Sequence, residues 1–428
     1  MLLFRQFIFQ TPYNYESKIM LNRNDTLELT IEKLTYTGDG LARHDNQVIF
    51  VPQTAPGDRV EVEITELKKR FARAQLRRII KPSPYRIEPP CDAFQRGCGG
   101  CQWLYLDYDA QLQIKHAIVQ EALIQHHLTN VPVKPILGMD DPFHYRNKGT
   151  VMVHATSEEI TVGFYEHRSN TIVDVFGSGT GECPVQATAN NTMLQEIGRR
   201  LRTEHRIISP PQRLAFRAGT DGKISANLPP QWKNKIQTTK HARFEFRGYQ
   251  FRVFGASFFQ INTNQTEKLL QVIDGYLSHH PIRQLVDLFC GVGLFAICFA
   301  GHAEQVWGIE SSRAAIKDAQ KNQHLNQTSN INWILGRAER ELFNLWQKEP
   351  ALDTLILDPP REGCDKRLIG DITQSNLQRV VYVSCDPMTL IRDLKRLQTG
   401  GFQIVELQPI DMFPHTYHIE CVAYLERD

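Results

Sequence analysis

Hydrophobic and polar residues follow different patterns in successive parts of this chain of 428 residues. From about residue 26 to residue 80, apolar residues recur at every second position in LELTIEKL, QVIFVP and RVEVEITEL, and turns rich in Gly and Pro separate these runs. Such runs predict the strands of a small antiparallel β-barrel. Residues 143–255 also read mostly as strands, whereas YDAQLQIKHAIVQEALIQHH at 108–127 has apolar residues at helical spacing.

From about Gln260 onward, strand patterns alternate with helical ones. The amphipathic stretch TEKLLQVIDGYL is followed by the apolar runs QLVDLF, QVWGIE, TLILDPP and VVYVSCDP, with helical patterns between them. This alternation predicts an α/β domain with a doubly wound parallel sheet. The chain is too long for one core. The patterns divide it into an N-terminal extension (1–24), a barrel (25–82), a strand-rich central domain (83–258) and the α/β domain (259–428).

Composition restricts where the protein works and what attracts its partners. The net charge is only +2, so affinity for nucleic acid must come from local clusters of Lys and Arg. No apolar run approaches the roughly 18 residues needed to cross a bilayer, and MLLFRQFIFQ is too interrupted for a secretory signal. These features predict a cytoplasmic protein without a membrane segment. Met20 is an alternative start to Met1.

A basic run follows the last predicted strands of the barrel. Six of the eleven residues from Lys68 to Arg78 are Lys or Arg, with Phe71 among them. The run is compatible with an ordinary solvated face and also with a surface that tracks phosphates. The segment resembles a TRAM domain, an OB-like RNA-binding module, and this resemblance implies an RNA partner.

Glycines and acids lie where the strands of the α/β domain should end. Gly291 and Gly293 follow the first strand, which contains Asp287, and Glu310 closes the next strand. The glycine spacing satisfies a loose dinucleotide fingerprint, so a nicotinamide site is one interpretation. The acids at 287 and in LDPP at 357–360 favour a different cofactor. The pattern resembles a class I S-adenosylmethionine methyltransferase with a Rossmann-like sheet, and the positive sulfonium of S-adenosylmethionine prefers nearby carboxylates.

The stretch RVVYVSCDP ends a predicted buried strand with Cys385, in front of a loop that contains proline. A cysteine at this position could serve as a small apolar residue of the core or as a nucleophile. Five stretches favour the nucleophile: FFQIN at 258–262, DLFCGVG at 287–293, LDPPR at 357–361, SCDP at 384–387 and DMFPHTYHIE at 411–420. Together they resemble the RNA uracil-C5 methyltransferase family, and the barrel with four further cysteines resembles its ribosomal-RNA branch.

This resemblance implies a role for each matching residue. Cys385 falls on the nucleophile that adds to C6 of uracil, and Glu420 on the base that removes the C5 proton. Asp386 is expected to hydrogen-bond the uracil edge, and Arg361 to orient the base or polarise a carbonyl. The positions that contact S-adenosylmethionine are Gln260, Phe289, Gly291, Glu310 and Asp358.

The chain departs from the family pattern at two positions of the cofactor site. Leu294 stands where relatives often have a polar residue, and Gly336-Arg337 occupies a loop that usually offers Asn or an acid to the adenine side. The resemblance therefore assigns no cofactor contact to either position.

Four cysteines form a second candidate site. Cys91, Cys98 and Cys101 lie within eleven residues, and Cys183, followed by proline, is a distant fourth. Disulfides are rare in the cytoplasm, and four thiolates bind zinc or an iron–sulfur cluster. With only one C-x-x-C pair present, the pattern favours a structural [4Fe–4S] cluster, which the family resemblance also implies. The remaining cysteines are predicted to be core residues, namely Cys290, Cys298, Cys364 and Cys421.

The leading prediction is therefore a monomeric RNA 5-methyluridine methyltransferase that acts on 23S rRNA. A transfer-RNA T-loop enzyme of the same family is an alternative substrate assignment. An iron–sulfur oxidoreductase with a nicotinamide at Gly291 and Gly293 is the rival enzyme. An RNA-binding assembly factor with an inert α/β domain is the rival without catalysis, and it predicts that Cys385 is dispensable.

Overall fold

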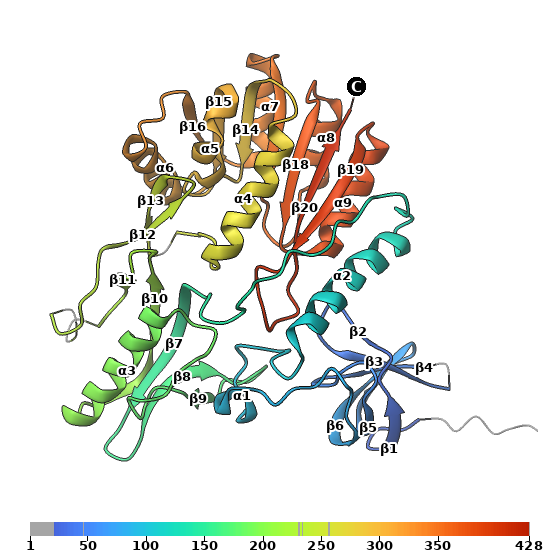
Figure 1. Cartoon of the computed structure of the whole chain (residues 1–428), viewed down its shortest axis with the longest axis vertical. Helices are drawn as coiled ribbons and strands as arrows, with labels where there is room; N and C mark the ends of the chain where they lie inside the picture. The colour runs from blue at the N-terminus through green and yellow to red at the C-terminus, as the bar shows by residue number, and fades with distance from the viewer. Residues whose placement is uncertain (1–20, 46, 230–231, 233, 256, 428) are drawn as a thin grey trace, which may run out of the picture. The chain divides into compact units, whose positions relative to one another are not determined.

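The computed structural model describes residues 21–45, 47–229, 232, 234–255 and 257–427 (Figure 1). The choice between Met1 and Met20 as the start falls outside these residues. The chain divides into two compact units, of which one contains residues 21–35 and 39–84 and the other contains residues 36–38 and 85–428. No helix among the described residues is long and apolar enough to cross a lipid bilayer.

The smaller unit is a six-stranded sheet with an apolar interior. Its strands lie in the order β1 (Thr26–Thr30), β5 (Arg59–Leu67), β6 (Phe71–Lys81), β4 (Gln47–Val51), β3 (Gly40–His44) and β2 (Lys33–Leu34). Val60, Val62 and Ile64 of β5 point inward and are fully buried, because alternate residues of a strand face opposite sides. Neighbouring strands are antiparallel except β4 and β6, which run parallel. The prediction of small alternating strands is confirmed, but it missed this parallel pair.

The N-terminal half of the larger unit contains a five-stranded antiparallel sheet, a hairpin and three helices. Helix α3 (Thr188–Thr203) packs on one face of the sheet. There its residues Leu194, Ile197 and Leu201 form one core with Val151 and Val153 of the sheet. The helix predicted at 108–127 is confirmed as α2. The sheet has the order β11 (Ile224–Ala226), β10 (Ile208–Ala218), β7 (Lys148–Ala155), β8 (Ile160–Tyr165) and β9 (Ile172–Asp174); the other elements are α1 (Asp92–Gln95), α2 (Tyr108–Gln125), α3 (Thr188–Thr203), β12 (His241–Phe246) and β13 (Tyr249–Phe254).

The C-terminal half is a seven-stranded sheet flanked by helices. All its strands are parallel except β20, which runs antiparallel between β18 and β19. The order is β16 (Ile331–Leu335), β15 (Ala303–Glu310), β14 (Ile282–Leu288), β17 (Leu352–Leu357), β18 (Arg379–Ser384), β20 (Glu420–Glu426) and β19 (Gln403–Ile410). Its helices are α4 (Thr263–Leu277), α5 (Leu294–Cys298), η2 (Ala300–His302), α6 (Arg313–Leu325), α7 (Ala338–Lys348), α8 (Lys366–Gln374) and α9 (Pro387–Thr399).

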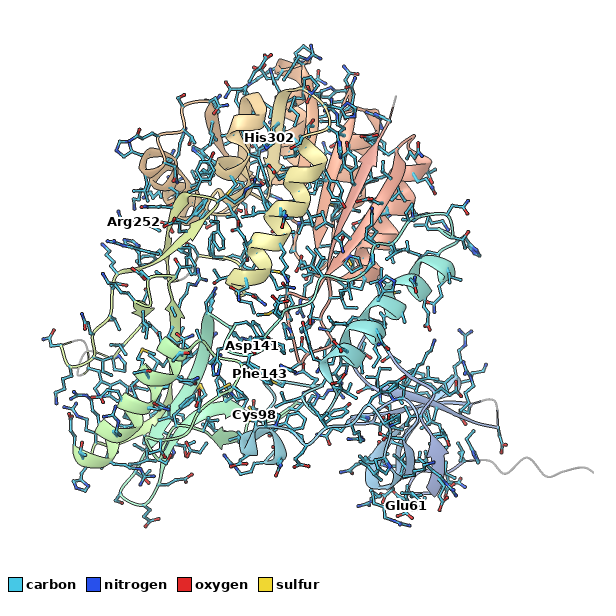
Figure 2. The ribbon with its side chains drawn as sticks, in the orientation of Figure 1. Glu61, Cys98, Asp141, Phe143, Arg252 and His302 are labelled. Carbon is cyan, nitrogen blue, oxygen red and sulfur yellow. The ribbon has the colours of Figure 1, made fainter. Side chains whose placement is uncertain are left out.

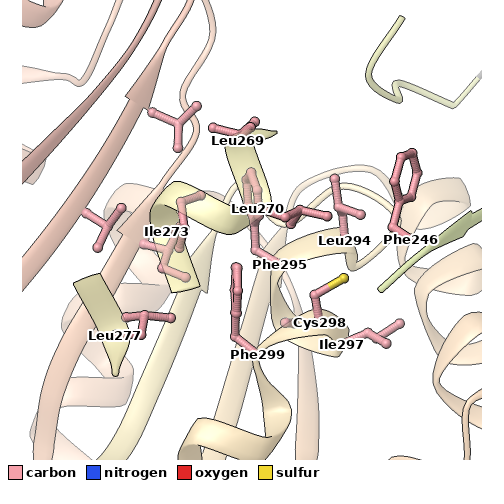
Figure 3. Packing of buried hydrophobic residues seen from close by; sticks show 14 of the residues in the cluster. Phe246, Leu269, Leu270, Ile273, Leu277, Leu294, Phe295, Ile297, Cys298 and Phe299 are labelled. Atoms are coloured by element: carbon pink, nitrogen blue, oxygen red, sulfur yellow. The ribbon is translucent and has the colours of Figure 1, made fainter. Parts of the chain in front are cut away.

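Apolar stripes on α4 and α5 anchor these helices in the core of the sheet domain (Figure 3). Leu270 and Ile273 of α4 are fully buried in one cluster with Phe299, which follows α5. Asn262 caps α4, because its side chain accepts a hydrogen bond from Gln265 N at 3.2 Å. The sequence FFQIN therefore ends in a helix cap, which fixes the backbone beside Gln260.

Candidate active site at the ends of the strands

The predicted catalytic residues Cys385 and Glu420 and the predicted cofactor residue Asp358 meet at one edge of the seven-stranded sheet. Asp358 follows β17 and Cys385 follows β18, and the carboxyl ends of parallel strands lie at a common edge. Strand β20 runs in the opposite direction, so its first residue, Glu420, begins at the same edge. Ser384 pairs with Cys421 across these strands, which brings Cys385 next to Glu420.

Burial and nearby charges control the thiol of Cys385. Burial is the main cause that raises its pKa to about 12, and the carboxyls of Glu420 and Asp358 raise it further. Arg361 acts in the opposite direction, through its charge and through a hydrogen bond to the thiol. The thiol is therefore protonated near neutral pH when the site holds no substrate. Arg361 is the basic neighbour that a nucleophilic cysteine requires.

Two carboxyls lie beside the thiol, of which Glu420 is buried and Asp358 is half-buried. Glu420 is only 3% exposed, and burial followed by the charge of Asp358 holds its pKa well above its usual range. Burial also raises the pKa of Asp358 to about 7. The charge of Arg361 favours the ionised form of Glu420. A carboxyl with a raised pKa suits general base catalysis near neutral pH.

His418 is a residue of this site that the sequence interpretation did not single out. Arg361 Nη2 lies 3.2 Å from Nε2 and 3.3 Å from Nδ1 of its ring. Burial, and then the charge of Arg361, lower the pKa of His418 to about 4, so the imidazole is neutral and can accept. The sequence feature that could have assigned His418 to the site is its position two residues before Glu420.

Asp386 has a structural task at the same strand end. Its Oδ1 accepts hydrogen bonds from Met388 N at 2.9 Å and Thr389 N at 3.0 Å, so it caps helix α9. Pro387 occupies the first turn, where a missing N–H is tolerated. The expected contact with uracil would have to use the other carboxylate oxygen.

The glycine turn after β14 is the place where a cofactor was predicted to bind. Glu310 at the end of β15 connects this turn to the residues after its own strand, because one oxygen accepts from Gly291 N at 3.2 Å and the other from Ser312 N at 2.6 Å. Gly293 has φ 86°, and a Cβ there would lie 2.6 Å from the Trp333 ring. The turn therefore requires glycine.

Phe289, a predicted cofactor residue, and Asp287, an acid of the same motif, have unusual environments. Phe289 adopts φ 69°, an uncommon conformation for a residue with a side chain, which marks this turn as a constrained site. Asp287 is fully buried, and one of its oxygens accepts from Ala296 N at 2.8 Å. Burial is the main cause that raises its pKa to about 8, and the charge of Asp358 adds to it.

Gln260 is fixed by the segment that precedes β7. Asn147 donates from Nδ2 to Gln260 O at 3.0 Å, and its backbone N–H donates to Ile261 O at 2.9 Å. Gln260 itself is buried. At the two departures from the family pattern, Leu294 is buried in the core and Arg337 is exposed beside Glu339.

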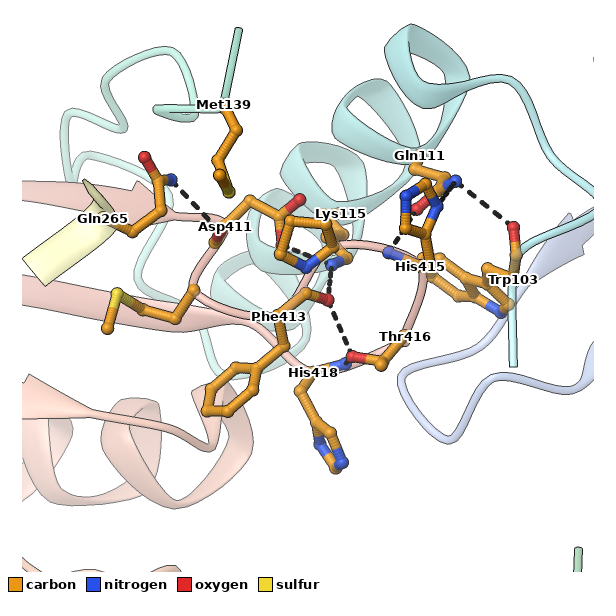
Figure 4. A network of polar contacts seen from close by, with 12 residues as sticks. Trp103, Gln111, Lys115, Met139, Gln265, Asp411, Phe413, His415, Thr416 and His418 are labelled. Carbon is orange, nitrogen blue, oxygen red and sulfur yellow. Dashed lines mark hydrogen bonds and ion pairs between the residues drawn. The ribbon is translucent and has the colours of Figure 1, made fainter. Parts of the chain in front are cut away.

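A buried ion pair holds the loop that leads to Glu420 (Figure 4). Lys115 of α2 lies 2.6 Å from Asp411 Oδ1, and both side chains are fully buried. Lys115 Nζ also donates to Phe413 O at 3.1 Å, and Tyr108 OH donates to Asp411 Oδ2 at 2.9 Å. The residues from Asp411 to Ile419 are thus attached to a helix almost three hundred positions earlier in the chain.

The four predicted metal-ligating cysteines line one cavity. Cys91, Cys98, Cys101 and Cys183 surround a volume of about 280 Å³ beside β7; Figure 2 labels Cys98. Burial raises the pKa of Cys183 to about 12 and that of Cys101 well above its usual value, and neighbouring cysteines add to both effects. Among the described residues, no three His, Cys, Asp or Glu side chains converge closely enough to hold a single metal ion.

The other cysteines and the basic run also have defined places. The prediction of core positions is confirmed for the four cysteines at 290, 298, 364 and 421, which are all buried. Four cations of the basic run pair with carboxylates of the same unit, one of which, Glu61, is labelled in Figure 2. The pairs are Lys68–Glu66, Arg73–Glu66 and Arg73–Asp39, Arg77–Glu63 and Arg78–Glu61.

Strand order, the glycine turn and the single antiparallel strand define the C-terminal half as a class I methyltransferase fold, as predicted. Models of two families match the chain: the tRNA (uracil-5-)-methyltransferase family over residues 233–428, and the TRAM domain over residues 21–76. These matches agree with the resemblances inferred from the motifs.

Whole-length relatives extend this identification. Sequences described as uncharacterized RNA methyltransferases of Halalkalibacterium halodurans and Listeria innocua are 33% and 34% identical to this chain, and each match covers 95% of it and 98% of the relative. A solved tRNA (uracil-54, C5)-methyltransferase of Pyrococcus abyssi, in complex with S-adenosyl-L-homocysteine, shares the fold with a TM-score of 0.72 at 24% identity, over 93% of this chain and 100% of that chain. The chain belongs to the RNA (uracil-5-)-methyltransferase family and is an RNA-modifying transferase, which removes the oxidoreductase and the inert assembly factor from consideration.

Proposed function

We propose that this enzyme transfers the methyl group of S-adenosylmethionine to C5 of a uridine in RNA through a covalent adduct with Cys385. The observation that carries the proposal is the convergence of a thiol, an arginine, a buried carboxyl and a half-buried one at one strand edge. C5 of uracil is a weak nucleophile, because its attack on a methyl group disrupts a conjugated ring. A thiolate that first adds to C6 removes this obstacle.

The proposed reaction begins with the thiolate of Cys385. Its electron pair forms the S–C6 bond, and the electrons of the C5–C6 double bond move into an enolate. The enolate carbon C5 then attacks the methyl carbon of the donor, whose sulfonium–methyl bond breaks. Glu420 accepts the remaining proton from C5, the double bond re-forms, and the thiolate leaves. The target base must be outside a stack to reach the thiol.

Arg361 assists the first step. It is hydrogen-bonded to the Cys385 thiol and favours its ionised form. The neutral ring of His418 accepts from the same guanidinium and fixes its direction. The acids at 287, 310 and 358 lie at the strand ends where the donor's positive sulfonium and amino groups are expected. Gln260 and Phe289 complete the proposed donor site.

The test uses RNA in which the target uridine is replaced by 5-fluorouridine, offered with the methyl donor. The fluorine cannot leave as a proton does, so a link between protein and RNA should persist in denaturing gels. Cys385→Ala should form none, whereas Cys298→Ala, a change of the same size in the core, should form it normally. The absence of a link with the unaltered enzyme would refute the mechanism.

The favoured substrate is 23S rRNA, because the barrel and the four cysteines resemble the ribosomal-RNA branch. A transfer RNA is the second candidate, supported by the description of the family model and by the activity of the Pyrococcus abyssi enzyme. Mapping 5-methyluridine in both RNAs from a strain that lacks the protein separates the two: the lost residue identifies the substrate. The cytoplasmic location and the monomeric state remain predictions from the sequence.

The four-cysteine cavity is proposed to hold a [4Fe–4S] cluster. A single zinc ion would draw four sulfurs to about 2.3 Å from one point, and the described cysteines do not converge in that way. A cubane binds each cysteine at a different corner and so suits four thiols spread around a cavity. Bound there, it would serve as a cross-link between the segment at 91–101 and Cys183. Broad absorbance near roughly 400 nm with iron and sulfide in anaerobic preparations supports the cluster, and zinc without that absorbance would exclude it.

A further inference from the structure

The open face of the central five-stranded sheet collects cations from two strands. Lys148 on β7 pairs directly with Arg217 on β10, and Arg213 lies four positions earlier on the same strand. Residues of equal parity share one face of a strand. The alternate residues, including Val151 and Phe216, are buried in the core against α3. The three cations therefore occupy the face that α3 does not cover.

The two strands that carry these cations supply no carboxylate to this face. Residues 146–157 and 207–218, which contain β7 and β10, include no Asp or Glu. Asp174 of β9 lies on the same face, separated from Arg213 by two strands, and its Oδ1 accepts from Val162 N and Gly177 N.

None of the three cations forms an ion pair with a carboxylate within the ranges that the structure describes. Burial lowers the pKa of Lys148, and the charges of Arg217 and Arg213 lower it further. The three cations thus share one face of β7 and β10, and none of them is neutralised by a paired carboxylate among the described residues.

The cations of the barrel differ from those of the central sheet in their ion pairing. In the barrel the basic residues Arg77 and Arg78 are paired across strands with Glu63 and Glu61, so much of their charge is neutralised within the fold. A cation already paired with a carboxylate releases fewer counterions when it meets a phosphate. In the run from Lys68 to Arg78, carboxylates pair with four of the six cations, whereas among the described residues no carboxylate pairs with any of the three cations of the central sheet.

The same face adjoins the active-site segment. Arg217 is only 1% exposed, and its Nη2 donates to Ser257 O at 2.9 Å. Ser257 precedes Phe258, a large apolar residue that is 66% exposed, and Gln260 follows two positions later. An RNA strand that delivers a base to the active site would pass close to this segment. Arg213 is exposed and Lys148 half-buried, so both are accessible to a phosphate.

We propose that Lys148 and Arg213, with Arg217 behind them, form a binding site for the phosphodiester backbone of the RNA next to the target uridine. We call it the cationic face. The inference rests on the proposed function for the identity of the ligand. Arg217 does not contact the phosphate; it holds the backbone at Ser257 and adds to the local positive potential.

The test measures how salt weakens binding of a fluorescent uridine-containing RNA hairpin to the full-length protein without methyl donor. The variants are Arg213→Gln, Lys148→Gln and the double variant. Loss of one phosphate contact should lower the slope of log K against log [KCl] by about 0.7 for a single-stranded segment and about 0.9 for a duplex. The double variant should lose about twice as much.

Arg78→Gln is the matched control, because it also removes one positive charge but from a cation paired with Glu61. It should change the slope by clearly less than Arg213→Gln. Unchanged slopes in the Arg213 and Lys148 variants would overturn the proposal, and so would an equal effect of Arg78→Gln. Arg213→Glu provides a second check, since an exposed charge reversal should weaken binding more than Arg213→Gln.

Two further measurements distinguish an RNA-binding role of these cations from a role in the cysteine cavity and from the proposed methylation mechanism. Lys148 also lines the cysteine cavity. If the cations serve only that cavity, the variants should lose iron and visible absorbance and keep the salt slope, which would refute an RNA role. The fluorouridine adduct at saturating RNA reports on the proposed chemistry. An enzyme that forms no adduct but shows the predicted slopes would disprove the mechanism and leave the cationic face intact.

Discussion

Replacing Lys115 with methionine tests how the buried ion pair supports the active site. Methionine retains most of the apolar stem but leaves Asp411 as a buried carboxylate whose remaining side-chain partner is Tyr108. Breaking one member of a buried pair typically costs about 3–5 kcal/mol. We therefore expect the unit that contains residues 85–428 to lose about 3–5 kcal/mol of unfolding free energy in urea.

The functional effect should concern proton removal. Residues 411–419 lead to Glu420, and Lys115 anchors them through Asp411 and the carbonyl of Phe413. A displacement of about 1 Å can cost up to about 100-fold in rate. At a temperature where Lys115→Met remains folded, we expect slower turnover and accumulation of the methylated protein–RNA adduct on denaturing gels.

Two control variants test whether the effect comes from the buried charge. Lys134 forms a partly exposed pair with Glu406 at 3.0 Å, so Lys134→Met should cost only about 0–1 kcal/mol. Combining Lys115→Met with Asp411→Leu removes the buried carboxylate that the single variant leaves unpaired. The double variant should regain much of the unfolding free energy, while the adduct still accumulates. A Lys115→Met enzyme as stable as the Lys134→Met control, or one without extra adduct, would refute the reasoning.

Three further predictions follow from the charges of the site. Because the pKa of Cys385 is about 12, fluorouridine adduct formation should rise about tenfold per pH unit between pH 7 and 9; a plateau below pH 8 would contradict this. Arg361→Gln should slow adduct formation, since Arg361 lowers the pKa of that thiol, and Arg361→Lys should restore part of the rate; equal rates in the two variants would count against this role. Burial raises the pKa of Asp287 to about 8 from about 3.9 in an unfolded chain, so the folded state binds the extra proton and loses stability as pH rises from about 4 to 8. Asp287→Asn should flatten that loss in urea titrations at several pH values, and an unchanged pH dependence would exclude Asp287 as its source.

The patterns that predicted correctly are local ones. Alternation of strands and helices after residue 260 was sufficient for the doubly wound sheet, because each element must bury one apolar face. The strand-end motifs were sufficient to place Asp358 and Cys385 at one edge, and the family resemblance added Glu420. Only the insertion of β20 between β18 and β19, which positions Glu420, needed the three-dimensional structure.

Long-range pairings could not be read from the sequence. Lys115 occurs in a helix whose pattern is otherwise ordinary, and its partner Asp411 is 296 residues away. The run from Lys68 to Arg78 suggested a phosphate-tracking surface, but cross-strand carboxylates pair with four of its cations. The cations at 148 and 213 stand in strands without unusual composition, and only the register of β7 with β10 places them on one face, with Lys148 opposite Arg217 and Arg213 opposite Met152.

The place of β20 in the sheet bears on protein synthesis. This strand is interior and carries Glu420 at its beginning, yet it is translated after every other strand of the sheet. A nascent polypeptide that ends before residue 420 would expose the edges of β18 and β19 and would contain the nucleophile without its base. The active site is therefore complete only after β20 has been synthesised and has left the ribosome, and until then the unpaired edges of β18 and β19 could bind chaperones or other chains.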